Sequence, residues 1–219
     1  MTATSTVPRD EMLLARWCDG DVGAGNELIK RYLRPLRLYF GSKLSSEADV
    51  QDLAQATLVA CAERQRHEGS RLEGVASFRA YLFGIARNKL LRFYEHKGRK
   101  AASGEREDIG SVPLADLSPG PSTLVKLHER VDVLLVAMAA LSIDQQTAIQ
   151  LKYWHGLTQD EVADALGVPL GTVARRIHEA KRKLLERYAE LDSGQDVPRG
   201  ELNDDELRES LISMARRLL

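Results

Sequence analysis

The chain has 219 residues, with 31 Lys and Arg against 32 Asp and Glu, so its formal net charge is −1. A chain of this length buries one ordinary core or two small ones. It contains no apolar run approaching the ~18 residues of a membrane span, and its first residues lack the apolar stretch of a signal peptide. Two cysteines, Cys18 and Cys61, exclude a disulfide framework and a CxxC metal site, so we expect a cytoplasmic protein. Few aromatic residues (5%) and many charged ones (29%) favour an all-α fold.

The near-zero net charge conceals two basic blocks. Residues 79–100 carry seven bases and one acid, and residues 175–187 carry six bases and two acids. The stretch 105–116 and the tail after residue 190 are acidic. One basic block alone is more often a solvated helix face, but two blocks within predicted helices favour a nucleic-acid partner.

The N-terminal part of the chain, residues 9–100, predicts a domain of four helices, over 9–18, 22–43, 47–66 and 78–97. Pro35 should bend or interrupt the second helix, because proline lacks a backbone donor and clashes with the preceding turn. Ser46 and Ser77 are suited to cap the third and fourth helices.

Two of these helices carry distinctive surfaces. The third begins with an acidic patch (Glu47, Asp49 and Asp52), which a solvated helix start also explains. In the fourth, Leu82, Ala86, Leu90 and Phe93 follow helical spacing and should face the core. The opposite face offers an aromatic ring, an amide and two guanidiniums to unstacked bases and phosphates, from Tyr81, Asn88, Arg92 and Arg99.

Residues 101–123 are rich in Gly, Pro, Ser and acids and predict a flexible linker to a second helical domain, residues 124–190. That domain opens with an apolar stripe at spacings of three and four: Leu127, Val131, Leu134, Leu135, Met138 and Leu141. Ser142 can cap a helix that runs to about His155. Thr158 and Glu161 form a capping box for a helix ending at Leu166, and a last helix follows Gly167 over about 170–188.

A capped short helix, a glycine turn and a longer basic helix together form a helix-turn-helix pattern. The inward positions can meet in one small core: Val162, Leu166, Val168, Val173, Ile177 and Leu184. The outward positions are Ala174, Arg175, His178, Lys181 and Arg182. Such arginines can contact guanine edges, while lysines and Thr172 suit phosphates. A plain helical hairpin with solvated charges is the alternative.

Three segments in this order resemble the sigma factors of bacterial RNA polymerase, and the two-domain layout resembles the extracytoplasmic-function group. The segments are DVQDLAQAT (49–57), SFRAYLFGIARN (77–88) and GLTQDEVADALGVPLGTVARRIHEAKRKL (156–184). The resemblance covers about residues 9–188. It implies a region 2-like domain that docks on polymerase core and opens the minus-10 element, and a region 4-like domain that reads the minus-35 element.

The resemblance also assigns roles to residues. Docking on the coiled coil of the largest polymerase subunit would use Asp49, Gln51, Asp52 and Gln55. Minus-10 contacts would come from Arg79, Tyr81, Asn88, Lys89, Arg92 and Arg99, with Asn88 near a flipped base. Minus-35 contacts would come from Thr172, Arg175, Arg176, His178, Lys181 and Arg182, and the same domain would touch the polymerase flap. An anti-sigma protein is a further possible partner.

The chain departs from the family at several positions. Tyr81 stands where the minus-10 helix usually has Trp. Ala174 and Glu179 stand where the recognition helix commonly has basic residues, and Arg175 stands where a small Ser is common. We therefore do not assign the family's common minus-35 sequence to this chain.

A tail over 201–219 extends beyond the family pattern. Asn203 can cap an amphipathic helix whose apolar stripe is Leu207, Leu211, Met214 and Leu218. A helix this short needs a surface to pack on. The simpler hypothesis is packing on its own C-terminal domain, and the regulatory one is an acidic helix over a basic DNA face.

Other functions have weaker support. A stand-alone helix-turn-helix regulator needs neither the acidic docking helix nor the Asn88 helix. No phosphate loop, nucleophile motif or metal cluster indicates an enzyme, and no cofactor is expected. His155 and His178 have no partners at metal-ligand spacing, so we expect both at the surface or in the DNA groove.

Overall fold

The computed structural model describes residues 9–68, 77–99, 130–193 and 203–218, and all regular structure within these ranges is helical. The N-terminal domain contains α1 (Asp10–Cys18), α2 (Val22–Gly41), α3 (Glu47–Glu68) and α4 (Phe78–Arg99). The C-terminal domain contains α6 (Arg130–Met138), α7 (Ile143–Tyr153), α8 (Gln159–Leu166) and α9 (Leu170–Ser193), followed by α10 (Asp204–Leu218). The predicted all-α fold is confirmed. The predicted linker 101–123 and residues 124–129 lie outside the described residues.

Local signals start the N-terminal helices. The side chains of Asp21, Ser46 and Ser77 accept backbone hydrogen bonds from the third residue after each of them, at 3.0, 3.2 and 3.3 Å. Helix α2 continues through Pro35, so the expected interruption does not occur. Buried Tyr32 and Leu36 flank the proline, and their packing stabilises the helix on both sides of it.

The helix-turn-helix has the predicted construction. Thr158 and Glu161 form the capping box of α8, and Gly167 ends that helix in the left-handed conformation (φ 65°), which glycine adopts without steric cost. The predicted inward residues are buried, except for half-buried Val168. Helix α9 extends to Ser193, five residues beyond the predicted end, because no glycine or proline stops it before then.

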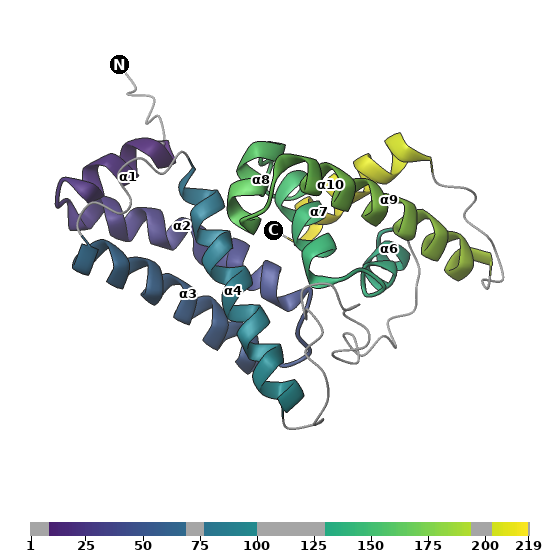
Figure 1. Ribbon diagram of the computed structural model, residues 1–219, viewed down its shortest axis with the longest axis horizontal. Helices are drawn as coiled ribbons and strands as arrows, with labels where there is room; N and C mark the ends of the chain where they lie inside the picture. Colours follow the sequence, from purple (N-terminus) through teal and green to yellow (C-terminus); the bar gives the residue numbers. More distant parts are fainter. Residues whose placement is uncertain (1–8, 69–76, 100–129, 194–202, 219) are drawn as a thin grey trace, which may run out of the picture.

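The two domains pack directly against each other. Figure 1 shows α1 to α4 on the left and α6 to α10 on the right, with α4 and α8 near the boundary. Every residue from Ile143 to Leu151 in α7 is buried. This helix packs on α8, α9 and α10, while Asp144, Thr147 and Gln150 meet side chains of the N-terminal domain.

Helix α10 packs on α6, α7 and α9. Its apolar residues Leu207, Leu211 and Met214 are fully buried, and Asn203 caps it by accepting from the amides of Asp205 and Glu206 at 3.0 Å. This is the packing on its own domain that the simpler hypothesis for the tail expected.

Candidate nucleic-acid interface

The recognition helix α9 presents three exposed charged or polar candidates. Arg175 and Arg182 form exposed ion pairs one turn along the same helix, with Glu179 at 3.0 Å and Glu186 at 2.5 Å. His178 is exposed on the same helix. Exposed pairs of this kind contribute only ~0.3–0.5 kcal/mol, so a phosphate or base edge can replace the carboxylate at little cost.

The other minus-35 candidates on α9 have less exposed side chains. Arg176 has a side chain that is 19% exposed, and its Nη2 lies 2.7 Å from Oδ2 of Asp144. Lys181 is equally enclosed and pairs with Asp204 at the start of α10. Thr172 is half-buried near the helix start. The side chains of Arg176 and Lys181 are therefore engaged within the protein itself.

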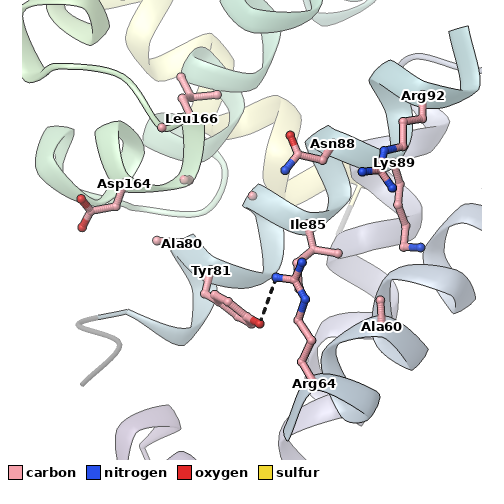
Figure 2. Close-up of a pocket in the computed structure, with 13 residues that line it drawn as sticks. Ala60, Arg64, Ala80, Tyr81, Ile85, Asn88, Lys89, Arg92, Asp164 and Leu166 are labelled. Atoms are coloured by element: carbon pink, nitrogen blue, oxygen red, sulfur yellow. Dashed lines mark hydrogen bonds between the residues drawn. The ribbon is translucent and has the colours of Figure 1, made fainter. Parts of the chain in front are cut away.

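Helix α4 carries the second basic surface, beside a cavity of about 420 Å³. Tyr81, Asn88, Lys89 and Arg92 line it, and Asn88 and Arg92 are exposed (Figure 2). Arg64 of α3 completes the basic wall and donates to the Tyr81 hydroxyl at 3.4 Å. Arg64 was not predicted from the sequence. The available signal was its position on α3, one turn after Cys61 and on the helix next to α4.

The opposite wall of this cavity comes from the C-terminal domain. Asp164, Ala165, Leu166 and Gly167, at the end of α8, line it. Figure 2 shows Asp164 and Leu166 across from the α4 side chains. The turn that leads into the recognition helix thus lies beside the surface predicted to contact minus-10 bases.

Two of the predicted minus-10 residues, Arg79 and Arg99, are not among the residues that line the cavity. Arg79 donates to the Tyr32 hydroxyl at 3.2 Å and to the carbonyl oxygen of His155, and it lies 3.8 Å from Asp10. Arg99 is the last residue of α4, and its side chain lies outside the described residues. Phe93, expected in the core, is half-buried and has Lys97 Nζ 5.5 Å from its ring centroid.

Helix α3 carries the residues that the resemblance assigns to polymerase docking. Gln51, Asp52 and Gln55 are exposed and Asp49 is half-buried. Val59, 46% exposed, lies one turn after Gln55 and places an apolar side chain beside these polar residues, which the sequence analysis did not predict.

Glu47 is the first residue of α3, and two neighbouring side chains contact its carboxylate. Gln51 donates to it at 3.0 Å and Arg37 of α2 pairs with it at 2.6 Å. These contacts, that of Gln51 first, lower the pKa of Glu47 below its ordinary value, so its carboxylate stays charged to a lower pH than an isolated glutamate.

His155 corrects an expectation, because it is buried rather than at the surface. Its ring centroid lies 4.3 Å from that of Phe83 in α4. Burial, with Arg79 and Lys43 nearby, lowers the pKa of His155 to about 3. His178 is exposed, as expected. The described residues contain no group of three or more potential metal ligands, and none of their helices is long and apolar enough to cross a membrane.

Comparison with family models gives two matches in chain order. The model described as Sigma-70 region 2 matches residues 28–100, which include α3 and α4. The model described as Sigma-70, region 4 matches residues 132–184, which include the helix-turn-helix.

Known relatives agree with these matches. The chain is 30% identical over 139 residues to the ECF RNA polymerase sigma factor SigL of Mycobacterium tuberculosis, covering 63% of this chain and 73% of that protein. It is 27% identical over 175 residues to the RNA polymerase sigma factor NccH of Alcaligenes xylosoxydans xylosoxydans, covering 80% and 92%.

Two solved structures are similar in fold. CnrH, in complex with the cytosolic domain of CnrY, is 25% identical with a TM-score of 0.56, over 85% of this chain and 99% of that one. The sigma factor RpoE of Bartonella quintana, in complex with the anti-sigma factor NepR, is 24% identical with a TM-score of 0.55, over 75% and 96%. The paired regions and the identity to SigL show that this chain belongs to the extracytoplasmic-function group of RNA polymerase sigma factors.

Proposed function

We propose that this sigma factor binds RNA polymerase core, reads a minus-35 element with α9 and a minus-10 element with α4, and helps to open the DNA. The observation that carries this division is the presence of two basic reading surfaces on separate domains, each in the region whose family model suits that role. The chain acts in the cytoplasm and catalyses no reaction itself. A stand-alone regulator is not favoured, because it needs no region 2.

For the minus-35 element, Arg175, His178 and Arg182 are the candidates for base edges. Their exposure supports this role, and the weak pairs with Glu179 and Glu186 can be exchanged for DNA contacts. We assign phosphate contacts to the residues at the margin of this face, which are Thr172, Arg176 and Lys181.

For the minus-10 element, Tyr81 and Asn88 are the candidates for unpaired bases. An aromatic ring can stack on a base, and an amide can both donate to and accept from its edge. Lys89, Arg92 and Arg99 would hold the backbone of the separated strand. Arg79, which is engaged with Tyr32 and His155, would contribute only after a rearrangement.

For docking, Asp49, Gln51, Asp52 and Gln55 would contact the coiled coil of the largest polymerase subunit. The exposed carboxylate of Asp52 and the half-buried one of Asp49, beside exposed Val59, suit a basic, partly apolar helical surface. The flap of the polymerase would bind the C-terminal domain. We also propose an anti-sigma partner, since the structurally similar sigma factor RpoE was solved with the anti-sigma factor NepR bound.

Reconstitution with core polymerase tests this function. The purified chain should form a stoichiometric complex with core and should direct initiation from a subset of genomic promoters in a pooled transcription assay. Core mixed with a variant carrying Asp52→Lys and Gln55→Lys should lose the complex, whereas Glu11→Lys on α1 serves as a surface control. Absence of both core binding and promoter-dependent initiation would rule the proposal out.

A further inference from the structure

The recognition helix α9 begins with small residues on its exposed face. Gly171 and Ala174 are exposed in its first two turns, and a side-chain carbon at Gly171 would meet nothing within 4 Å. Packing within the protein therefore does not require glycine at this position. Small residues at the start of a recognition helix let it lie deep in the major groove, so that side chains of the following turns reach base edges.

Glu179 lies on the same face and is unusual there. Gly171, Arg175 and Glu179 recur at four-residue spacing, which places them in one row along the helix. Glu179 is the single acid among residues 170–182, which carry four bases. Phosphates repel a carboxylate, so an acid on a surface that faces DNA lowers affinity unless a hydrogen-bond donor of the DNA meets it.

Helix stability does not explain Glu179. Its Oε1 accepts from Nη1 of Arg175 at 3.0 Å, and the two side chains are 36% and 66% exposed. An acid that precedes its base by four residues stabilises a helix better than the reverse order, which is the order found here. Exposed pairs contribute little in either order. The fold therefore does not need a carboxylate at this position.

The edges of two stacked G·C base pairs fit both ends of this ion pair. In the major groove guanine offers the acceptors O6 and N7, which suit arginine, and cytosine offers the N4 amino donor, which suits a carboxylate. Thymine presents an acceptor instead, and adenine places its N7 acceptor beside its amino group, so both suit a carboxylate less well. The ends of the Arg175 and Glu179 side chains are 3.0 Å apart, close to the ~3.4 Å rise between base pairs.

We propose that Glu179 is a specificity-determining residue of this sigma factor: its carboxylate accepts a hydrogen bond from N4 of a cytosine in the minus-35 element, in the base pair stacked next to the one whose guanine Arg175 contacts. The inference rests on the proposed function for the placement of α9 in the major groove. On binding, the two side chains exchange each other for these two bases. The acid at position 179 then selects a base where a basic residue would hold phosphate or guanine.

Selection from a randomised DNA pool tests the proposal. Core polymerase carrying the chain is mixed with promoter duplexes whose minus-35 segment is random, and the DNA that is bound and transcribed is sequenced. The wild type should enrich two adjacent G·C pairs. Glu179→Ala should lower the preference at one of them by at least about fivefold and retain the other, and Arg175→Ala should do the reverse.

Glu186→Ala is the matched control. Glu186 is exposed on the same helix, pairs with Arg182 one turn before it at 2.5 Å, and lies about two turns further from the helix start than Glu179. Its loss removes the same charge, so Glu186→Ala should retain both base preferences, whatever its effect on overall affinity. A change of affinity without a change of preference is the signature of a charge that reads no base.

A double-mutant cycle isolates the contact. Replacing the selected cytosine by thymine exchanges the N4 donor for an acceptor, so the wild type should lose at least about fivefold in affinity and Glu179→Ala should lose much less. Glu179→Gln gives a second readout, because its amide suits adenine and should shift the preference at that position from cytosine toward adenine. Circular dichroism checks that each variant keeps its helices.

Two results would overturn the inference: a wild type that enriches no adjacent G·C pairs, or an unchanged preference in Glu179→Ala. Selective initiation that does not depend on Glu179 contradicts the inference alone. A chain that never binds core or directs initiation contradicts the proposed function instead. The selection is then made with the free chain at low salt, where the exposed face of α9 is available without polymerase, and the same two results decide on Glu179.

Discussion

Asn88 is the residue whose placement is most difficult to explain by folding alone. It is exposed in the middle of α4, where asparagine is a poor helix former. Asn88→Ala should therefore leave helix stability unchanged or higher. If the amide binds an unpaired base, promoter opening should fall by about 5- to 150-fold, as expected for loss of ~1–3 kcal/mol of base contact.

Permanganate reactivity of unpaired thymines measures this opening, and a gel shift before opening measures closed-complex affinity. Asn26→Ala is the matched control, since it makes the same change at an exposed position of α2. Equal losses in closed-complex binding and in opening would contradict a role in strand separation.

Lys181 is a second residue with a specific expectation, because Asp204 engages its ammonium. Asp204→Asn should free Lys181 for phosphate and raise affinity for promoter duplex about two- to fivefold at low salt, the size of an ion pair at the surface. Fluorescence anisotropy of the duplex with the free protein measures this. Asp205→Asn removes the same charge one residue along, and an equal gain there would indicate general charge repulsion instead.

At the scale of elements, α10 is a packed part of the C-terminal domain. Leu211 is fully buried against it, so Leu211→Ala should lower the free energy of unfolding by about 2–5 kcal/mol. Urea denaturation followed by circular dichroism measures the change. Ser213→Ala, on an exposed position of the same helix, should change stability by less than about 0.5 kcal/mol. Equal effects of both variants would mean that α10 does not dock.

Helix identities and starts were predictable from sequence because their causes are local. Ser46, Ser77 and Thr158 cap their helices through amides three residues away, and Gly167 supplies a left-handed turn. The positions at which helices end were less predictable. Helix α9 runs past residue 188 for lack of a stop signal, and α2 passes Pro35 because tertiary packing outweighs one lost backbone bond.

At the scale of the whole molecule, the contact between the domains was not predictable. Asp144, Thr147 and Gln150 look like a solvated helix face in sequence, and only a partner more than fifty residues away buries them. The contact between the domains also explains where the side chains of Arg176 and His155 lie. Arg176 turns toward Asp144, and His155 is covered by Phe83. Sequence spacing places side chains on a helix face but does not show what covers that face.

His155 makes the closed form, in which the two domains pack against each other, sensitive to acid. Its ring lies against Phe83 across the domain boundary, and within the described residues its Nε2 has no hydrogen-bond partner. Burial, together with Arg79 and Lys43, lowers its pKa from 6.5 to about 3. A group whose pKa is lower in the closed form binds its proton more tightly in the open form. Closed-state stability is therefore complete above pH 6.5 and is lost progressively as the pH falls toward 3.

Between pH 7.5 and 5.5, His155 alone should lower the closed-to-open ratio about tenfold, since the open form takes up a proton that the closed form excludes. Burial also lowers the pKa of Lys43, and protonation of this group favours the open form in the same way. Single-molecule energy transfer between dyes at exposed Glu63 of α3 and Ala189 of α9 measures the ratio at each pH. His155→Phe keeps a ring against Phe83 but cannot be protonated, so it should remove the tenfold change in the closed-to-open ratio. The control His178→Gln, at an exposed site, should retain this change. An identical pH response in wild type and His155→Phe would show that His155 is not a sensor of the closed form.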